Sequence, residues 1–186
     1  MILMPIFSAV WSLREQGVAV KGDRWQRAID VTSRLLRFGG RLTGGSGNDI
    51  VDIRFVTIAT LGNEADFGDL TVGRSYFGAL SNATRSVAGG GYNGSSATNI
   101  MDYVNPTSAG DATDFGDLTS ARNYTAGLAN ATRGIFAGGA STNIIEYITI
   151  GSTGNAQDFG DLTQAREIIN AGASSTTRGV FFGGNT

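Results

Sequence analysis

The hexapeptide Asp-Phe-Gly-Asp-Leu-Thr occurs three times in this chain of 186 residues, at positions 66–71, 114–119 and 158–163. The three copies lie about 45 residues apart, and self-similarity at such a period is the signature of a repeat architecture. The repeated hexapeptide therefore predicts that most of the chain is built from similar structural units of about 45 residues.

Each hexapeptide belongs to a longer repeated pattern. A first arginine follows it, a second arginine comes 11 or 12 residues later, and a glycine pair stands five residues beyond that. The repeated positions are Phe67, Phe115 and Phe159; Asp69, Asp117 and Asp161; Arg74, Arg122 and Arg166; and Arg85, Arg133 and Arg178. Arg34 and the glycines at 39–40 keep the same five-residue step, which indicates a fourth, more divergent copy that begins near Trp25.

Each unit reads as four short β-strands. In the second unit these are residues 75–80 after the first arginine, 86–89 before the glycine pair, 99–104, and the segment that carries Phe115. In the third unit they are residues 123–128, 134–137, 143–150 and the segment that carries Phe159. The segments are rich in β-branched and aromatic residues and are bounded by Gly, Asn, Ser and Thr, which is typical of strands and turns. We expect an all-β fold of four-stranded antiparallel meanders, with units at about 24–72, 73–120 and 121–164 and a partial unit at 165–186.

The pattern resembles the kelch repeat, in which the second strand ends in a glycine pair and the following strands carry aromatic residues. Here those aromatics are Phe55, Tyr103 and Tyr147 on the third strand and the three hexapeptide phenylalanines on the fourth, where kelch units usually have Trp. The amino-acid sequences of residues 152–166 and 176–184 are similar to kelch-like repeats in structural proteins of tailed bacteriophages, especially those of aquatic bacteria. This resemblance implies β-propeller blades.

Three full units and two further strands fall short of the four blades of the smallest propellers, and the last unit would keep an unpaired edge. Either the apolar residues 2–10 complete that unit, or the missing strands come from another chain. We expect a homo-oligomer. The apolar N-terminal run is too short to span a bilayer and lacks the features of a secretory signal, so residues 1–22 are expected to form an attachment segment.

The composition excludes several function classes. The chain has no Cys and no His, which removes disulfides, thiolate metal sites and Ser-His-Asp triads. It has one lysine and a net charge of −2, so we expect no nucleic-acid binding, and we expect no membrane insertion. The kinase-like Asp-Phe-Gly occurs three times without the other kinase motifs, and the glycines of residues 89–94 match a dinucleotide fingerprint without a following helix. We therefore expect no enzyme, no cofactor and no metal site.

The repeated charges are expected to be structural, because a catalytic site is normally used once whereas a feature present in every unit holds the units together. We expect the repeat arginines and aspartates to form hydrogen-bonded pairs between units, since a guanidinium binds a carboxylate bidentately. Calcium binding by the Asp and Asn loops is the alternative. The hexapeptide phenylalanines should fill the space between units, and Gly68, Gly116 and Gly160 should allow tight turns.

The loop between the second and third strands varies most in length, spanning residues 41–50, 92–98 and 140–142 in successive units. In a meander this loop and the link to the next unit emerge at the same end. We expect a candidate binding face there, with Arg41, Tyr92 and Asn93 as its contact residues. The alternative is that these loops are tolerated surface insertions.

The phage resemblance implies a virion structural protein. We expect a tail-fibre or appendage subunit located in the phage particle, with other virion proteins as partners and a host-surface glycan as the ligand of the binding face. The alternative is a capsid decoration protein. A carbohydrate-active enzyme is less favoured, because its carboxylate pair would have to come from Glu64, Glu146 and Glu167, which fall on different strand types.

Overall fold

The computed structural model describes residues 19–22, 25–29, 34–41, 49–167 and 171–185. Within these ranges the chain forms fifteen β-strands and no helix, so the predicted all-β class is confirmed. Each strand pairs antiparallel with its neighbours in the sheet, as expected for short strands joined by tight turns.

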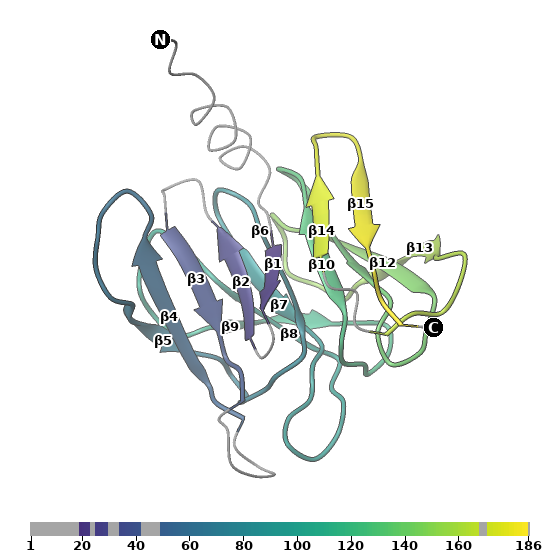
Figure 1. Cartoon of the computed structure of the whole chain (residues 1–186), viewed down its shortest axis with the longest axis horizontal. Coiled ribbons are helices and arrows are strands. Elements are labelled where there is room, and N and C mark those ends of the chain that lie inside the picture. The colour runs from purple at the N-terminus through teal and green to yellow at the C-terminus, as the bar shows by residue number, and fades with distance from the viewer. Residues whose placement is uncertain (1–18, 23–24, 30–33, 42–48, 168–170, 186) are drawn as a thin grey trace.

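Twelve of the strands form three four-stranded units that follow one another along the chain (Figure 1). The first unit contains β2 (Trp25–Ile29), β3 (Arg34–Phe38), β4 (Asp52–Thr57) and β5 (Ala65–Asp69). The second contains β6 (Gly78–Ser81), β7 (Ser86–Gly89), β8 (Ile100–Val104) and β9 (Thr113–Asp117). The third contains β10 (Ala126–Ala129), β11 (Arg133–Ala137), β12 (Ile144–Thr149) and β13 (Gln157–Asp161). β14 (Ala171–Ser174) and β15 (Gly179–Phe182) form a terminal pair.

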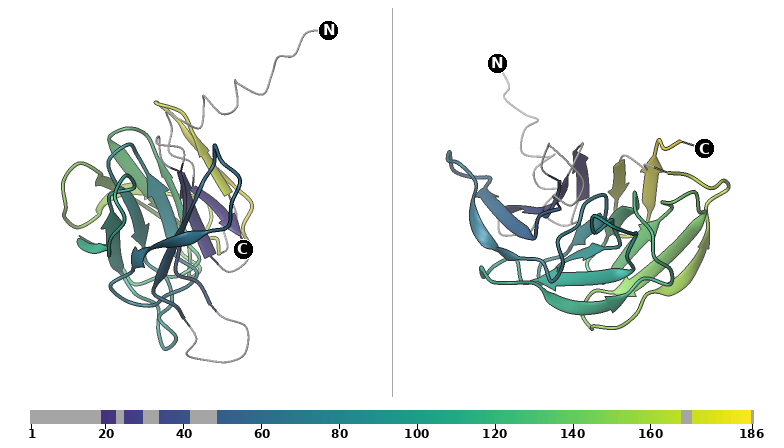
Figure 2. Two further views of the ribbon diagram at one scale, coloured as in Figure 1. Left: turned by 90° about the vertical axis from the view of Figure 1, so that its left-hand side faces the viewer. Right: turned by 90° about the horizontal axis from the view of Figure 1, so that it is seen from below.

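A strand that the sequence did not predict joins the two ends of this array. β1 (Ala19–Gly22) pairs with β2 along its whole length and with β14 through Val20 and Ala171. The first unit and the terminal pair thereby form one seven-stranded sheet, in the order β15-β14-β1-β2-β3-β4-β5. Figure 2 shows the units arranged along an arc with β1 and β14 on its inner side. Residues 19–22, expected to belong to an attachment segment, are therefore part of the sheet, and residues 1–18 lie outside the described residues.

The first strand of each later unit begins farther along the chain than predicted. β6 begins at Gly78 and β10 at Ala126, three residues after the expected starts. The reason is backbone conformation, because Tyr76 has a φ of 57° and Tyr124 a φ of 59°, and neither value is compatible with an extended strand. The second and third strands lie within one residue of their predicted bounds.

The core lies between successive units rather than inside any one of them. Phe77, Ala79, Ala88 and Val104 of the second unit pack with a set of buried residues of the first unit: Leu36, Phe38, Ile53, Phe67 and Leu70. The second and third units meet in the same way around Phe115 and Phe136. We call the side of a unit that meets the preceding unit its leading face, and the side that meets the following unit its trailing face.

The hexapeptide glycines lie in strands rather than in the predicted tight turns. Gly68 and Gly116 have φ values of 149° and 132° at a β-bulge, and the loop of the next unit crosses directly over them. A Cβ on Gly68 would lie 2.3 Å from the carbonyl oxygen of Gly110, and one on Gly116 would lie 2.6 Å from that of Gly154. Close approach of a neighbouring backbone is thus the physical reason for glycine here.

Candidate functional site

Two of the three predicted binding residues meet on the face formed by the loops that follow β3 and β7. The guanidinium of Arg41 lies 5.9 Å from the ring centroid of Tyr92, in a cation–π arrangement. Asn93 has a different role, because its Oδ1 accepts hydrogen bonds from the backbone N–H groups of Ser95 and Ser96 at 3.0 and 2.9 Å. Arg41 and Tyr92 therefore remain candidates for ligand contact, whereas the side chain of Asn93 shapes its own turn.

A pair of tyrosines that the sequence analysis did not single out belongs to the connections on the same side. The rings of Tyr76 and Tyr124 lie 4.7 Å apart at 39°, and both residues have positive φ. A left-handed backbone is strained for a bulky residue and is commonly held at functional sites. The available signal was a tyrosine two residues after the repeat arginine, at Arg74 and again at Arg122.

Electrostatics connect these groups into one cluster. Burial raises the pKa of the Tyr124 phenol, Tyr76 and Glu167 raise it further, and Arg41 opposes the shift. Glu167 accepts a hydrogen bond from Ser141 Oγ at 2.6 Å. The cluster therefore combines two tyrosine rings, a guanidinium and a carboxylate.

The first repeat arginine of the second unit is buried inside the array, where it pairs with a carboxylate. Arg74 is fully buried, and its Nη2 lies 2.8 Å from Asp102 Oδ2 on β8 of the same unit. It also donates to the carbonyl oxygens of Ile100 at 2.5 Å, Gly90 at 3.2 Å and Ala88 at 3.2 Å. Burial lowers the pKa of Arg74 and the carboxylate of Asp102 opposes this, as expected for a charge that is desolvated together with its partner.

Arg122 repeats the ion pair, with Glu146 on β12 as its carboxylate partner. The expected pairing of repeat arginines with hexapeptide aspartates between units is thus wrong for Arg74 and Arg122, whose carboxylate partners stand on the third strand of their own unit. These two carboxylates are linked to the preceding unit by threonines, since Thr71 Oγ1 donates to Asp102 and the backbone N–H of Thr119 donates to Glu146. The missed signal was an acidic residue at the same place in the third strand of both units.

The second repeat arginine stacks on the aromatic residue of the third strand. Arg85 lies 4.6 Å from the centroid of Tyr103, and Arg133 lies 4.6 Å from that of Tyr147. Arg85 Nη1 also donates to the carbonyl of Ile150 in the next unit at 2.9 Å. Arg34 does the same in the divergent first unit, stacking on Phe55 at 5.0 Å and donating to Pro106 O at 3.0 Å. Arg34 and Arg85 therefore connect neighbouring units.

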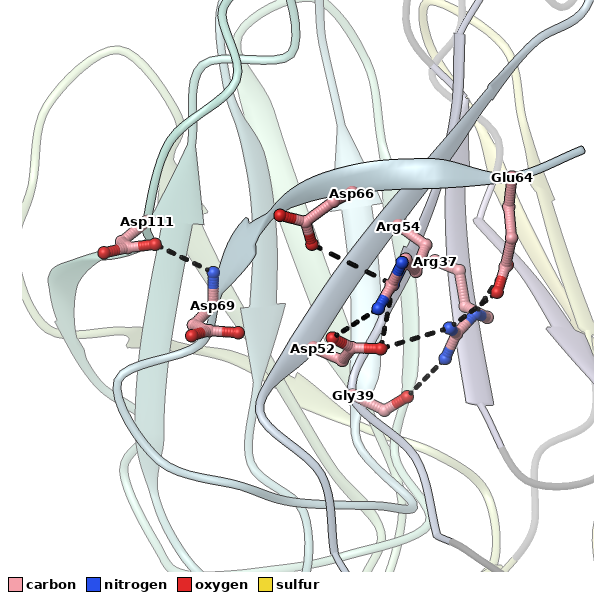
Figure 3. Close-up of polar contacts among 8 residues, drawn as sticks. All are labelled: Arg37, Gly39, Asp52, Arg54, Glu64, Asp66, Asp69 and Asp111. Carbon is pink, nitrogen blue, oxygen red and sulfur yellow. Dashed lines mark hydrogen bonds and ion pairs between the residues drawn. The ribbon is translucent and has the colours of Figure 1, made fainter.

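The hexapeptide aspartates take part through their backbones. The N–H of Asp69 donates to Asp111 Oδ1 at 3.0 Å (Figure 3). The carbonyl of Asp69 accepts from the N–H of Ala112 at 2.7 Å. Asp117 makes the same two bonds to Asn155 and Ala156. The loop before each fourth strand therefore caps the hexapeptide of the preceding unit.

The leading face of the first unit differs from those of the later units. Strand register places Arg37 and Arg54 where the second unit has Ala88 and Asp102 and the third has Phe136 and Glu146. Arg37 donates to both carboxylate oxygens of Glu64 at 3.1 Å, and Arg54 donates to both oxygens of Asp52 at 2.9 and 3.2 Å (Figure 3). Asp52 raises the pKa of Arg54 through this contact. A charged outer face is what a terminal repeat needs in order to remain in water.

At the other end of the array, the terminal pair covers only part of the trailing face of the third unit. Phe159 is 53% exposed, although its equivalents Phe67 and Phe115 are each 2% exposed. Val180 and Phe182 of β15 are 50% and 52% exposed. A pocket lies between β13 and β15, lined in part by Leu128, Phe159 and Ser174. The array therefore has one charged end and one apolar, incomplete end.

No protein-family model matches this chain, and a search of curated proteins found no significant relative. In the part of the chain that the structure describes, no helix is long and apolar enough to cross a membrane. No group of three or more Asp and Glu residues is arranged to hold a metal ion among the same residues.

Proposed function

We propose that this chain is a structural subunit of a bacteriophage virion, a tail-fibre or appendage component that is not an enzyme and assembles with other virion proteins. One observation carries the assembly role: the array is charged at its first leading face and apolar at its last trailing face. Exposed apolar surface of this kind, at the edge of a sheet, marks a site of protein association. The resemblance in sequence to kelch-like phage proteins supplies the viral context.

The four-stranded units are proposed to be kelch-like propeller blades. Their repeated strand order, shared bulge position and packing of one unit on the next support this interpretation. Residues 1–18 would then attach the array to the particle, and a homo-oligomer is one way to complete the ring. The mass of the purified chain, measured by light scattering, tests that oligomer: a monomer of 19.3 kDa would contradict it.

A host-surface glycan is the proposed ligand of the face that carries Arg41, Tyr92 and the Tyr76–Tyr124 pair. Soluble chain should inhibit adsorption of the phage to its host, and Tyr92→Ala should weaken that inhibition because it removes the ring on which Arg41 rests. Asn93→Ser is the matched control for damage to the loop. Equal inhibition by the parent and Tyr92→Ala would exclude this residue from the ligand site.

A capsid decoration protein is the second candidate, favoured by the same apolar end, which would serve equally well on a capsid. Quantitative mass spectrometry of purified particles separates the two. A fibre subunit is expected in tens of copies or fewer and a decoration protein in hundreds, and absence from particles would overturn both. The three candidate catalytic carboxylates are engaged elsewhere, with Arg37, Arg122 and Ser141, which argues against a glycosidase.

A further inference from the structure

The terminal pair repeats the first half of a unit in detail. β14 and β15 pair as β6 and β7 do, and Ser174 Oγ donates to Ala129 O in the preceding unit at 2.6 Å. Arg166 Nη1 donates to the carbonyl oxygen of the second glycine of its pair, Gly184, at 3.2 Å, where Arg74 Nη1 donates to that of the first glycine of its pair, Gly90. The terminal pair is therefore preorganised as the first and second strands of a fourth unit.

The contacts that a third and a fourth strand would make are open. In the sheet of described strands, β15 has no neighbour on its outer side, where β7 and β11 have β8 and β12. No ion pair joins Arg166 to a described carboxylate, whereas Arg74 and Arg122 have Asp102 and Glu146. No described aromatic ring lies under Arg178, although Arg34, Arg85 and Arg133 each have one.

The third unit shows the same deficit from its own side. A Cβ on Gly160 would meet nothing within 4 Å, although Gly68 and Gly116 lie under the loop of the following unit. Arg133 lines the pocket beside Phe159 and Arg178, and among the described residues it has no carbonyl partner like Ile150 O, which accepts from Arg85. Contacts are therefore open both where a third strand would lie and where the loop after it would lie.

We propose that the open edge of β15 binds an extended strand of a different polypeptide, in which an acidic residue is preceded by an apolar residue and followed by an aromatic one. The second and third units define this chemistry with Met101-Asp102-Tyr103 and Ile145-Glu146-Tyr147. The acid would pair with Arg166, the aromatic ring would lie under Arg178, and the backbone would extend the sheet by strand addition. The proposal deepens the proposed virion assembly by specifying the partner's sequence.

Two other occupants fit less well. Residues 1–18 contain one acidic residue, Glu15, but it lies between Arg14 and Gln16 and so lacks the apolar and aromatic neighbours of Asp102 and Glu146. A second copy offers β4, β8 and β12, but each of these strands is already paired on both sides in its own sheet. A strand from a different polypeptide can carry the required acidic residue, and it need not leave a sheet in which it is already paired.

The test uses the full chain and a labelled peptide with the sequence of residues 142–150. We expect saturable binding that weakens at least about tenfold when the peptide carries Glu146→Gln, because a hydrogen bond to a charged group is lost. In the variant Arg166→Met the Glu and Gln peptides should bind equally. In Arg178→Ala both should bind more weakly while their difference persists.

A lengthened chain provides a second test that does not depend on the solubility of the isolated peptide. In this chain a second copy of residues 142–163 follows Thr186, which reproduces the spacing after the glycine pair of the third unit. The unfolding temperature should rise, and it should rise less when the added segment carries Glu146→Gln.

Two sets of results would overturn the proposal. The first is no peptide binding together with no rise in unfolding temperature, or equal effects of the Glu and Gln forms. The second is an oligomer that dissociates on addition of the peptide, which would identify a second copy as the occupant. None of these results bears on particle copy number, which tests the virion role separately.

Discussion

Phe115 and Phe159 occupy the same position in successive units, yet 2% of the first and 53% of the second is exposed to solvent. Each packs edge-to-face with the tyrosine of its third strand, at 5.8 and 6.2 Å between centroids. The difference arises on the other side, where the loop that contains Gly154 covers Phe115 and no described loop covers Phe159. The same hexapeptide phenylalanine should therefore contribute differently to the free energy of unfolding in the two units, because a neighbouring loop covers only one of the two rings.

Truncating the two phenylalanines should separate these environments. Phe115→Ala is expected to lower the free energy of unfolding by about 3–5 kcal/mol, because it leaves a cavity between the second and third units. Phe159→Ala should cost much less, since that ring is half exposed. Urea unfolding followed by circular dichroism measures both, and similar losses would show that Phe159 is covered in solution.

Two of the hexapeptide glycines, Gly116 and Gly160, allow the steric cost of adding a Cβ to be measured separately from backbone strain. Gly116 and Gly160 have nearly equal φ values of 132° and 135°, so an alanine at either position carries similar backbone strain. Only at Gly116 would the new Cβ meet a neighbouring backbone. Gly116→Ala should therefore be more destabilising than Gly160→Ala by about 1–3 kcal/mol. Equal thermal shifts would mean that the loop over Gly116 moves away without cost.

The buried arginine pairs should be sensitive to loss of the carboxylate. Asp102→Asn and Glu146→Gln are each expected to destabilise the chain by about 3–5 kcal/mol, because they leave a guanidinium buried without its counter-charge. Asp161→Asn is the matched control, since Asp161 is exposed. Chemical denaturation measures the three, and a control as damaging as Asp102→Asn would refute this interpretation.

Stability should also fall at alkaline pH through Tyr124. Its pKa is raised in the folded chain, mainly by burial, so the neutral phenol is favoured there. The unfolded chain ionises first, near pH 10, and the stabilisation is lost as the pH rises from there through the folded-state value. Tyr124→Phe should retain more of its unfolding free energy than the parent above about pH 10. Parallel pH profiles for the two would contradict this assignment.

The strands that sequence predicted well are those whose side chains carry a β pattern. The runs before and after each glycine pair are β-branched or aromatic, and their bounds agree with β7, β8, β11 and β12 to within one residue. The predicted starts of β6 and β10 were three residues too early. The positive φ of Tyr76 and Tyr124, which delays both strands, depends on how the two tyrosines pack, and local strand propensity does not encode that packing.

The partners of the repeat charges were harder to predict. A guanidinium and its carboxylate are separated by 28 residues at Arg74 and Asp102 and by 24 at Arg122 and Glu146, so only the folded meander brings them together. β1 was not predicted from the sequence for a related reason. The short run Ala-Val-Lys-Gly has no strong strand pattern, and its place is fixed by partners at both ends of the chain, β2 and β14.

The charged face of the first unit limits how subunits of the proposed assembly could stack. Subunits that stack head to tail grow without limit if both ends are adhesive, and a filament results unless the ring closes. Here Arg37, Arg54 and their carboxylates would have to be desolvated before another sheet could pack on them. Under the proposed assembly we therefore expect a partner to add at the apolar end and not on the charged face.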